Sequence, residues 1–174
     1  MNRPVVLLVH GAFAESASWN RVIRRLRDSR LTAVAVANPL RGFEGSTLGQ
    51  ALQAYPVASG GDEFRIDPAT FHRQFCADLD SEEAALMAAT QRPVTERALS
   101  DGLAVDEAPW RTVPSWFVHG DKDRNIPAAA LRFMAERADS RGTREIAGAS
   151  HALAASQPDA VTATILDAAD HARG

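Results

Sequence analysis

The stretch VVLLVHGAF, residues Val5–Phe13, decides the fold class of this 174-residue chain. Its first five residues form a continuous apolar run, which is typical of a strand covered on both faces in a parallel sheet. The run ends in a loop of small residues, as expected at the carboxyl end of a central strand. The stretch therefore predicts an α/β protein whose chemistry lies at this end of its sheet.

A βαβ unit is predicted around this strand. Apolar residues at helical spacing follow it over residues 19–26, and Ser16 or Ser18 is expected to cap that helix. A second apolar strand, Thr32–Ala37, ends at an Asn-Pro dipeptide. Strand, helix and strand within about forty residues predict a right-handed parallel crossover.

The middle of the chain has a different composition. Residues 40–62 are Gly-rich and polar, which predicts an irregular segment with a weak helical or irregular patch over Leu48–Tyr55. Helices are expected after it, one capped by Asp67 and one starting at Asp80. This pattern predicts a helical cap at about residues 43–112, inserted between the halves of the sheet.

The alternation of strand and helix then resumes. Ser115–His119 and Arg144–Ala147 are predicted strands, Pro127 opens a helix, and Ser156 with Pro158 starts the last helix. The chain is therefore interpreted as one α/β domain over residues 1–174, with flanking helices and a parallel sheet of about four strands.

Composition limits the function classes. The chain is 45% hydrophobic and 24% charged with a net charge of −3, and its Lys and Arg residues are scattered. Such a chain offers no basic stripe for nucleic acid or an anionic membrane. The apolar run near the start is too short for a signal peptide or a membrane span, so a cytoplasmic location is expected.

Several conspicuous side chains are interpreted as structural. The single cysteine, Cys76, is interpreted as a small buried residue because no catalytic motif accompanies it. His119 is interpreted as a packing residue at a strand end, and the three tryptophans as anchors of the core or cap. The histidines and acids show no metal-ligand spacing, so neither a metal nor a cofactor is expected.

Three predicted strand ends carry groups suited to acyl-transfer chemistry. Gly11 and Ala12 lie in a small-residue loop from which a backbone N–H can face a developing oxyanion. Asp123 lies in an acidic turn, where a buried carboxylate can orient an imidazole. His151 precedes a helix and can act as a general base.

Four motifs resemble the α/β-hydrolase superfamily, in the branch of plant hydroxynitrile lyases, plant methylesterases and their bacterial relatives. They are Val-His-Gly-Ala-Phe, Asn-Pro-Leu-Arg-Gly, Asp-Arg-Asn-Ile-Pro and Gly-Ala-Ser-His. The resemblance implies that Asp123 is the triad acid rather than Asp121, that His151 is the base, and that Phe13 or Ala12 donates an oxyanion N–H. It also implies an ancestor that acted on small esters or cyanohydrin-like molecules, so the expected partner is a small-molecule substrate or ligand.

The chain departs from the family pattern because it has no Gly-x-Ser-x-Gly nucleophile elbow. Family members carry two helices and two strands after the Asn-Pro-Leu-Arg-Gly motif, a block of roughly 50 to 60 residues. Here cap-like sequence follows Arg41-Gly42 directly, as after an internal deletion. Residual hydrolase activity, catalytically silent binding of a small molecule, and a non-functional deletion product all remain open.

The missing block has a consequence for the sheet. In the family order the strands Val5–Val9 and Ser115–His119 are separated by the two absent strands, and both would expose an apolar edge. Direct pairing of these strands into a four-stranded sheet is the favoured outcome. The alternatives are an open or partly molten fold and self-association, in which another copy completes the sheet.

Overall fold

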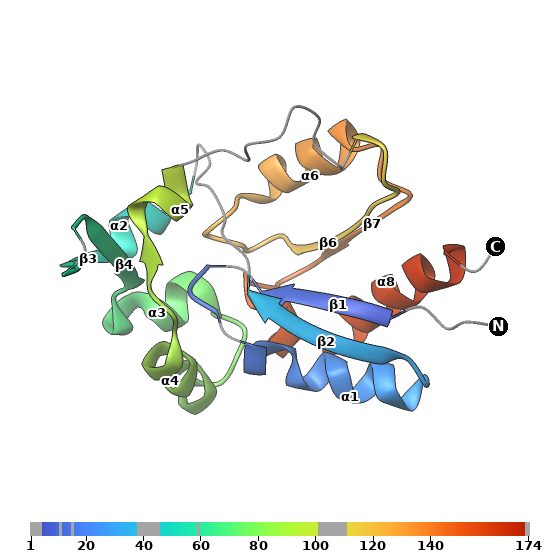
Figure 1. The fold of residues 1–174 in the computed structure, drawn as a ribbon, viewed down its shortest axis with the longest axis horizontal. Coiled ribbons are helices and arrows are strands. Elements are labelled where there is room, and N and C mark those ends of the chain that lie inside the picture. The colour runs from blue at the N-terminus through green and yellow to red at the C-terminus, as the bar shows by residue number, and fades with distance from the viewer. Residues whose placement is uncertain are drawn as a thin grey trace.

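A computed structural model describes residues 5–10, 12–14, 16–37, 46–58, 60–100 and 111–172. The chain forms two separate parallel strand pairs and a small antiparallel sheet, with helices packed around them (Figure 1). None of the helices in these ranges has the length and apolar character needed to cross a bilayer.

The first strand pair joins β1 (Val5–His10) and β2 (Thr32–Ala37) in parallel, as predicted. Their connection is a 3₁₀ turn, η1 (Ser16–Trp19), followed directly by α1 (Asn20–Asp28). The expected serine cap of α1 is wrong, because its N-cap is Trp19, which makes no capping hydrogen bond. The chain enters α1 from a turn that is already helical, so no extended cap residue precedes it.

The second strand pair joins β6 (Trp116–Gly120) and β7 (Gly142–Ile146), also in parallel. Helix α6 (Ala128–Arg137) connects the two strands. The last strand begins and ends earlier than the predicted Arg144–Ala147. The helices after β7 are α7 (Leu153–Ser156) and α8 (Pro158–His171). Pro158 lies in the first turn of α8 as predicted, but the expected start at Ser156 is wrong, because Ser156 ends α7 and Gln157 is the N-cap of α8.

The four-stranded sheet expected from the sequence is wrong. Within the described ranges β1 pairs with β2 and β6 pairs with β7, and no ladder joins β1 to β6. Helix α8 contacts α1 as well as β6 and β7, so the two halves are joined by side-chain packing (Figure 1). Their shared core includes Leu8, Val22, Leu26, Ala149 and Val161. This packing buries apolar surface without requiring the two strands to pair.

One face of β1 is exposed. The side chains of Val5 and Leu7 are 65% and 61% exposed, whereas Leu8 on the opposite face is 3% exposed. The expectation that this strand is covered on both faces is therefore wrong for Val5 and Leu7. No element in the described part of the chain covers them, because the shared core contacts the other face.

Residues 52–66 form a hairpin that the sequence analysis does not predict. Strands β3 (Leu52–Pro56) and β4 (Asp62–Ile66) are antiparallel, and β5 (Val94–Thr95) adds to the far edge of β4. Gly60 and Gly61 have φ angles of 90° and 86°, a region that favours glycine and allows the turn. The helical or irregular patch expected over residues 48–55 is helical only as far as residue 51.

Four helices accompany this antiparallel sheet. They are α2 (Leu48–Ala51), α3 (Pro68–Phe75), α4 (Ser81–Thr90) and α5 (Glu96–Ser100). Asp67 caps α3 and Asp80 caps α4 through their side chains, as predicted. The described residues 46–100 therefore combine helices with a sheet, which corrects the expectation of a purely helical insertion. They pack around a second core that includes Phe13, Ile66, Phe71 and Phe75.

Candidate active site

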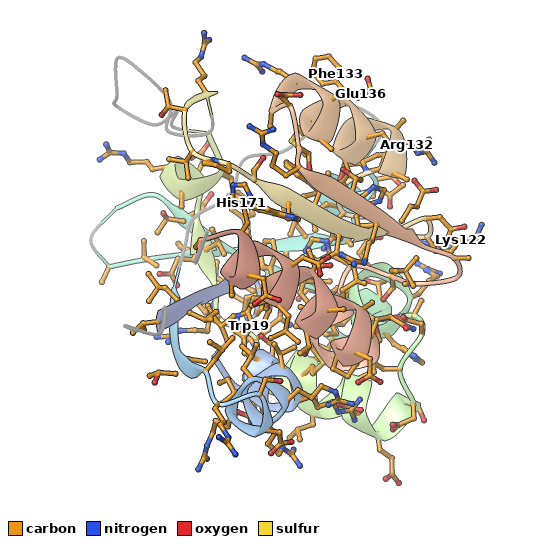
Figure 2. All side chains as sticks on the ribbon, turned by 90° about the vertical axis from the view of Figure 1, so that its right-hand side faces the viewer. Trp19, Lys122, Arg132, Phe133, Glu136 and His171 are labelled. Carbon is orange, nitrogen blue, oxygen red and sulfur yellow. The ribbon has the colours of Figure 1, made fainter. Side chains whose placement is uncertain are left out.

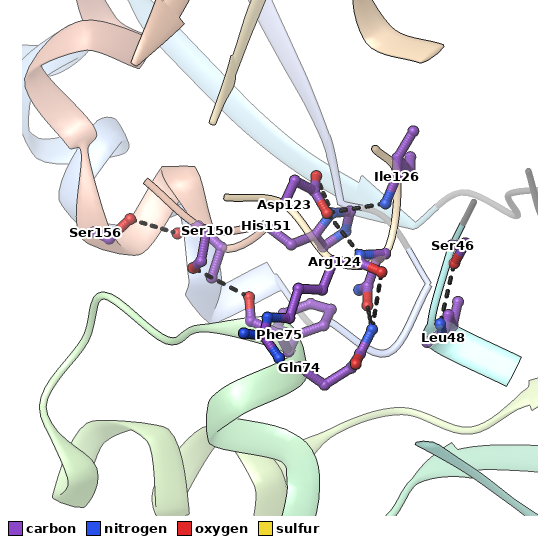
Figure 3. A network of polar contacts seen from close by, with 12 residues as sticks. Ser46, Leu48, Gln74, Phe75, Asp123, Arg124, Ile126, Ser150, His151 and Ser156 are labelled. Atoms are coloured by element: carbon purple, nitrogen blue, oxygen red, sulfur yellow. Dashed lines mark hydrogen bonds and ion pairs between the residues drawn. The ribbon is translucent and has the colours of Figure 1, made fainter. Parts of the chain in front are cut away.

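Asp123 and His151 lie at the carboxyl ends of neighbouring parallel strands, and the structure brings them together (Figure 3). The Nδ1 atom of His151 lies 2.8 Å from Oδ2 of Asp123. The other carboxylate oxygen accepts the backbone N–H groups of Asn125 and Ile126, at 2.8 and 2.9 Å. The Asp123 side chain is 4% exposed and that of His151 is 17% exposed. This arrangement orients the imidazole and leaves its Nε2 for proton exchange.

Asp121 has a different role in the same turn. Its Oδ1 accepts the backbone N–H of Gly148 at 2.7 Å, and its Oδ2 lies 3.6 Å from Nζ of Lys122. The carboxylate therefore links the loop after β6 to the loop after β7. This geometry agrees with the interpretation of Asp121 as the less suitable partner for His151.

The close approach of the two loops depends on Gly120. A Cβ atom at this position would lie 2.1 Å from the backbone oxygen of Ala149, a distance that backbone atoms cannot accommodate without moving. The same oxygen accepts the backbone N–H of Lys122 at 3.0 Å. The glycine at the end of β6 thus lets the loop that carries His151 pass close to the loop that carries Asp123.

Helix α3 supports the site from the other side. The amide of the buried Gln74 donates to Arg124 O at 3.0 Å and to Asn125 Oδ1 at 2.9 Å (Figure 3). The Phe75 ring contacts the His151 ring edge-on, with centroids 5.0 Å apart. Sequence reasoning missed both residues, because a glutamine and a phenylalanine in a predicted helix carry no local signal of a functional site.

Ser150, the neighbour of His151, is a structural residue. It is 1% exposed and donates from Oγ to Asp78 Oδ1, with Phe75 O a second acceptor at 3.4 Å. Burial acts to raise the pKa of Asp78, but hydrogen bonds from Ser150 and Ser156 outweigh it, so the pKa lies below its ordinary value. Its contact with the Ser150 hydroxyl and the burial of that residue argue against Ser150 as a nucleophile.

The predicted oxyanion loop is described only in part, since Gly11 lies outside the described residues. Phe13 has a φ of 61°, an unusual value for a bulky side chain, and is 2% exposed within the core. Ala12 packs against the same core. A sharp turn therefore follows β1, and the role of the Ala12 and Phe13 N–H groups as oxyanion donors stays a prediction.

A cavity of about 230 Å³ lies beside Asp123 and His151. Its lining is largely apolar. Besides Asp123 and His151, here called the dyad, the polar lining residues in the described ranges are Ser18, Trp19 and His119. The apolar residues that line it are Ala14, Phe75, Met87, Val118, Ile126, Leu131, Ala152, Leu153, Ala154 and Val161. An apolar cavity with a few convergent polar groups is typical of a small-molecule site. Sequence reasoning interpreted His119 and Trp19 as packing residues and did not connect them with the dyad.

Two other kinds of chemistry find little support in the structure. Cys76 is buried, and burial, together with the charges of Asp78 and Glu83, raises the pKa of its thiol to about 12. It therefore stays a thiol and is a poor nucleophile, in agreement with its interpretation as a buried core residue. Across the ranges that the structure describes, His, Cys, Asp and Glu side chains form no group of three that could hold a metal ion.

Comparisons with known proteins address the family. Among solved structures, the chain is similar to a methylesterase from Arabidopsis, with a TM-score of 0.76 and 11% identity over 97% of this chain and 100% of that one. It is also similar to tomato methylketone synthase I complexed with 2-tridecanone, with a TM-score of 0.71 and 15% identity over 98% and 99% of the two chains. A pyrethroid hydrolase from Sphingobium faniae is similar too, with a TM-score of 0.66 and 14% identity over 97% of this chain and 98% of that one.

These similarities, at such low identity, concern the fold. No curated protein sequence matches the chain. Residues 45–164, well over half of the sequence, match the model of the Alpha/beta hydrolase family. By this match, and with the fold of its structural neighbours, the chain belongs to the α/β-hydrolase family.

Proposed function

We propose that this chain binds a small carbonyl compound with an apolar tail in the cavity beside Asp123 and His151, and that it does not hydrolyse esters through a serine nucleophile. The observation that carries the proposal is an oriented acid–base pair on an apolar cavity, in a sequence without a Gly-x-Ser-x-Gly motif. His151 can exchange a proton with a bound molecule, but acyl transfer also requires a nucleophile that acts in concert with the base.

The structural neighbours support this ligand class. Tomato methylketone synthase I has been solved with 2-tridecanone and, as a variant, with β-ketoheptanoate. Both molecules carry a carbonyl group on an aliphatic chain, and the esters cleaved by a methylesterase carry a carbonyl as well. A cavity lined by Met87, Leu131 and Val161 with a histidine at its edge suits the same combination of groups.

We further infer that the family ancestor was an esterase and that its nucleophile segment was lost between Arg41 and Ser46. Two observations support this inference: β1 and β6 each pair with a single strand in the described ranges, and Leu7 is exposed on an apolar strand. Resequencing the coding region across this join tests it directly. Recovery of a strand and a serine elbow there would overturn the proposal of a chain without a nucleophile.

A second candidate function is residual hydrolysis through Ser18. This residue lines the same cavity as His151 and is the one serine among the described residues that does so. A hydroxyl in the cavity of an oriented imidazole is the minimum arrangement for nucleophilic attack. The turn that carries Ser18 precedes α1 and follows no strand directly, so it lacks the geometry of a nucleophile elbow.

Labelling with a fluorophosphonate probe separates the two candidates. We expect no stoichiometric labelling of the native chain and no hydrolysis of p-nitrophenyl butyrate above the rate of the His151→Ala variant. Labelling that disappears in both His151→Ala and Ser18→Ala would establish the second candidate instead. The binding function is tested by adding 2-heptanone and measuring NMR chemical-shift changes of the residues that line the cavity. If these resonances do not shift, the proposal is contradicted.

A further inference from the structure

A second cavity lies where helices α2 and α3 meet the turn that carries Asp123. Its volume is about 270 Å³, and it shares no described lining residue with the cavity beside the dyad. The polar residues that line it in the described ranges are Thr47, Gln50, Thr70, Arg73, Gln74 and Arg124. No carboxylate is among these lining residues, so the two arginines bring positive charge to the cavity without an acidic partner on its described wall.

Hydrogen bonds fix the backbone around this cavity by converging on the carbonyl oxygen of Arg124. That oxygen accepts from Gln74 Nε2 at 3.0 Å (Figure 3) and from the backbone N–H of Thr47 at 3.2 Å. Gln74 is 5% exposed, and Arg73 precedes it on α3. The two arginine side chains therefore start from neighbouring backbone segments that are held together, and both line the same cavity.

The hydroxyl donors of the cavity wall are already used within the protein, whereas the arginine donors are not. Thr47 Oγ1 donates to Gln74 Oε1 at 3.0 Å, and Thr70 Oγ1 donates to a backbone oxygen at 3.1 Å. Arg73 and Arg124 are exposed, and their side chains form no hydrogen bond or ion pair with any described residue. Each guanidinium offers five N–H donors and no acceptor. A suitable ligand must therefore supply several acceptor atoms and negative charge.

A phosphate group meets this requirement better than a carboxylate does. A carboxylate has two oxygens, which a single guanidinium can occupy in a bidentate pair, whereas a phosphate monoester has three terminal oxygens and about 1.5 to 2 negative charges at pH 7. We propose that Arg73 and Arg124 bind a phosphate group, and that the amide of Gln50 on the same cavity wall is a further donor. Inorganic phosphate and a phosphate monoester share this chemistry. The site goes beyond the proposed carbonyl-binding function and does not depend on it.

The first test is a titration of the native chain with inorganic phosphate at constant ionic strength. Proton–nitrogen NMR spectra follow the Nε–H resonances of the arginines, and the variants Arg73→Gln and Arg124→Gln identify the two resonances of interest. Phosphate should shift both in a saturable way, and chloride should shift neither. Formate, a carboxylate with a single charge, should bind at least about threefold more weakly than phosphate.

The affinities of the variants give the second readout. We expect Arg73→Gln and Arg124→Gln each to weaken phosphate binding about three- to tenfold, a moderate loss because both side chains are exposed and solvent screens their charges. The matched control is Lys122→Gln, which removes one positive charge from the same turn. Lys122 does not line the cavity, and its side chain extends outward at the edge of the molecule (Figure 2). This variant should change phosphate affinity less than about twofold.

Glycerol 3-phosphate distinguishes the two sources of the phosphate group. Tighter binding of this monoester than of inorganic phosphate would support an organic phosphate as the ligand, and equal or weaker binding would support free phosphate. The site is refuted if neither arginine resonance shifts in a saturable way. It is also refuted if Lys122→Gln loses as much affinity as the arginine variants, since net charge alone would then attract the anion. Equal affinity for formate and phosphate would overturn the choice of phosphate. None of these outcomes depends on whether the cavity beside the dyad binds 2-heptanone.

Discussion

The two parallel strand pairs of this chain differ in how completely their surroundings support them. Around β6 and β7, the glycine at position 120, the capped turn of Asp123 and the amide of Gln74 hold two loops in fixed contact. Around β1 and β2, two large apolar side chains face solvent and the far edge of β1 has no partner in the described ranges. The comparison shows that the acid–base pair depends on short loops and one supporting helix, and does not require a continuous sheet.

The largest effect is expected from Phe75→Ala, which removes the ring that packs against both Phe71 and His151. Truncation of a buried phenylalanine lowers the free energy of unfolding by about 3–5 kcal/mol. Urea denaturation measures this loss, and the line width of the His151 ring protons reports whether the imidazole loses its position. The control Phe133→Ala, at a 60% exposed position on α6, should cost at most about 0.5 kcal/mol. Equal costs for the two variants would show that α3 does not support the site.

A smaller but still large effect is expected from Gly120→Ala. The added methyl group would meet backbone atoms of Ala149, so the loop that carries His151 must move, at a cost of about 1–3 kcal/mol. The matched control is Gly49→Ala in α2, where a Cβ atom meets nothing within 4 Å and alanine favours the helix. Thermal melting of both variants checks the prediction. A Gly120→Ala protein as stable as the Gly49→Ala protein would mean that the loops do not approach as described.

The next effect depends on pH and concerns Asp78, which binds Ser150 next to the dyad. Because the pKa of Asp78 is lowered in the folded chain, its ionised form stabilises the fold above the unfolded pKa of about 4. That contribution should be lost as the pH falls through the lower folded value. Asp78→Asn should therefore flatten the loss of stability in acid, measured by urea denaturation between about pH 6 and pH 3. An unchanged acid dependence in the variant would contradict the role of this carboxylate.

The smallest effect on stability is expected at the exposed face of β1. We propose that a second copy of the chain covers this face and the unpaired strand edge, because an apolar edge strand is a template for pairing. Leu7→Lys should change the free energy of unfolding by about 0.5 kcal/mol or less, since the side chain is already exposed. It should also reduce concentration-dependent association in sedimentation velocity.

The control for that experiment is Leu86→Lys on α4. Leu86 is 65% exposed, similar to Leu7, but it does not lie on a sheet. The substitution adds the same charge and should leave association unchanged. A native chain that stays monomeric at all concentrations would refute the association of copies through β1.

Sequence reasoning succeeded where the determinants are local. The parallel pairing of Thr32–Ala37 follows from a short apolar run on each side of a helix, and the Asp67 and Asp80 caps follow from the preference of aspartate for helix starts. The approach of Asp123 to His151 follows from their places at the ends of two neighbouring strands. Each of these features depends on residues close in the chain or on one strand pair.

Sequence reasoning failed for features that depend on contacts between segments far apart in the chain. The contacts of Gln74 and Phe75 with the dyad loops join residues 50 or more positions apart, and no local pattern marks them. The described strands β1 and β6 do not pair, and the two halves are joined by packing of α8, which an argument from strand edges alone does not include. The hairpin at residues 52–66 was missed because a polar, Gly-rich segment predicts an irregular loop as readily as a turn between strands.

The position of α8 in the chain has a consequence for the order of folding. This helix contacts α1, β6 and β7, so it joins the two strand pairs, yet it is the last helix in the chain order of the described residues. During synthesis from the amino terminus, β1, α1 and β2 are made before the residues of α8 that complete their shared core. The contacts of α8 with α1, β6 and β7 can therefore form only after the amino-terminal strand pair has been made.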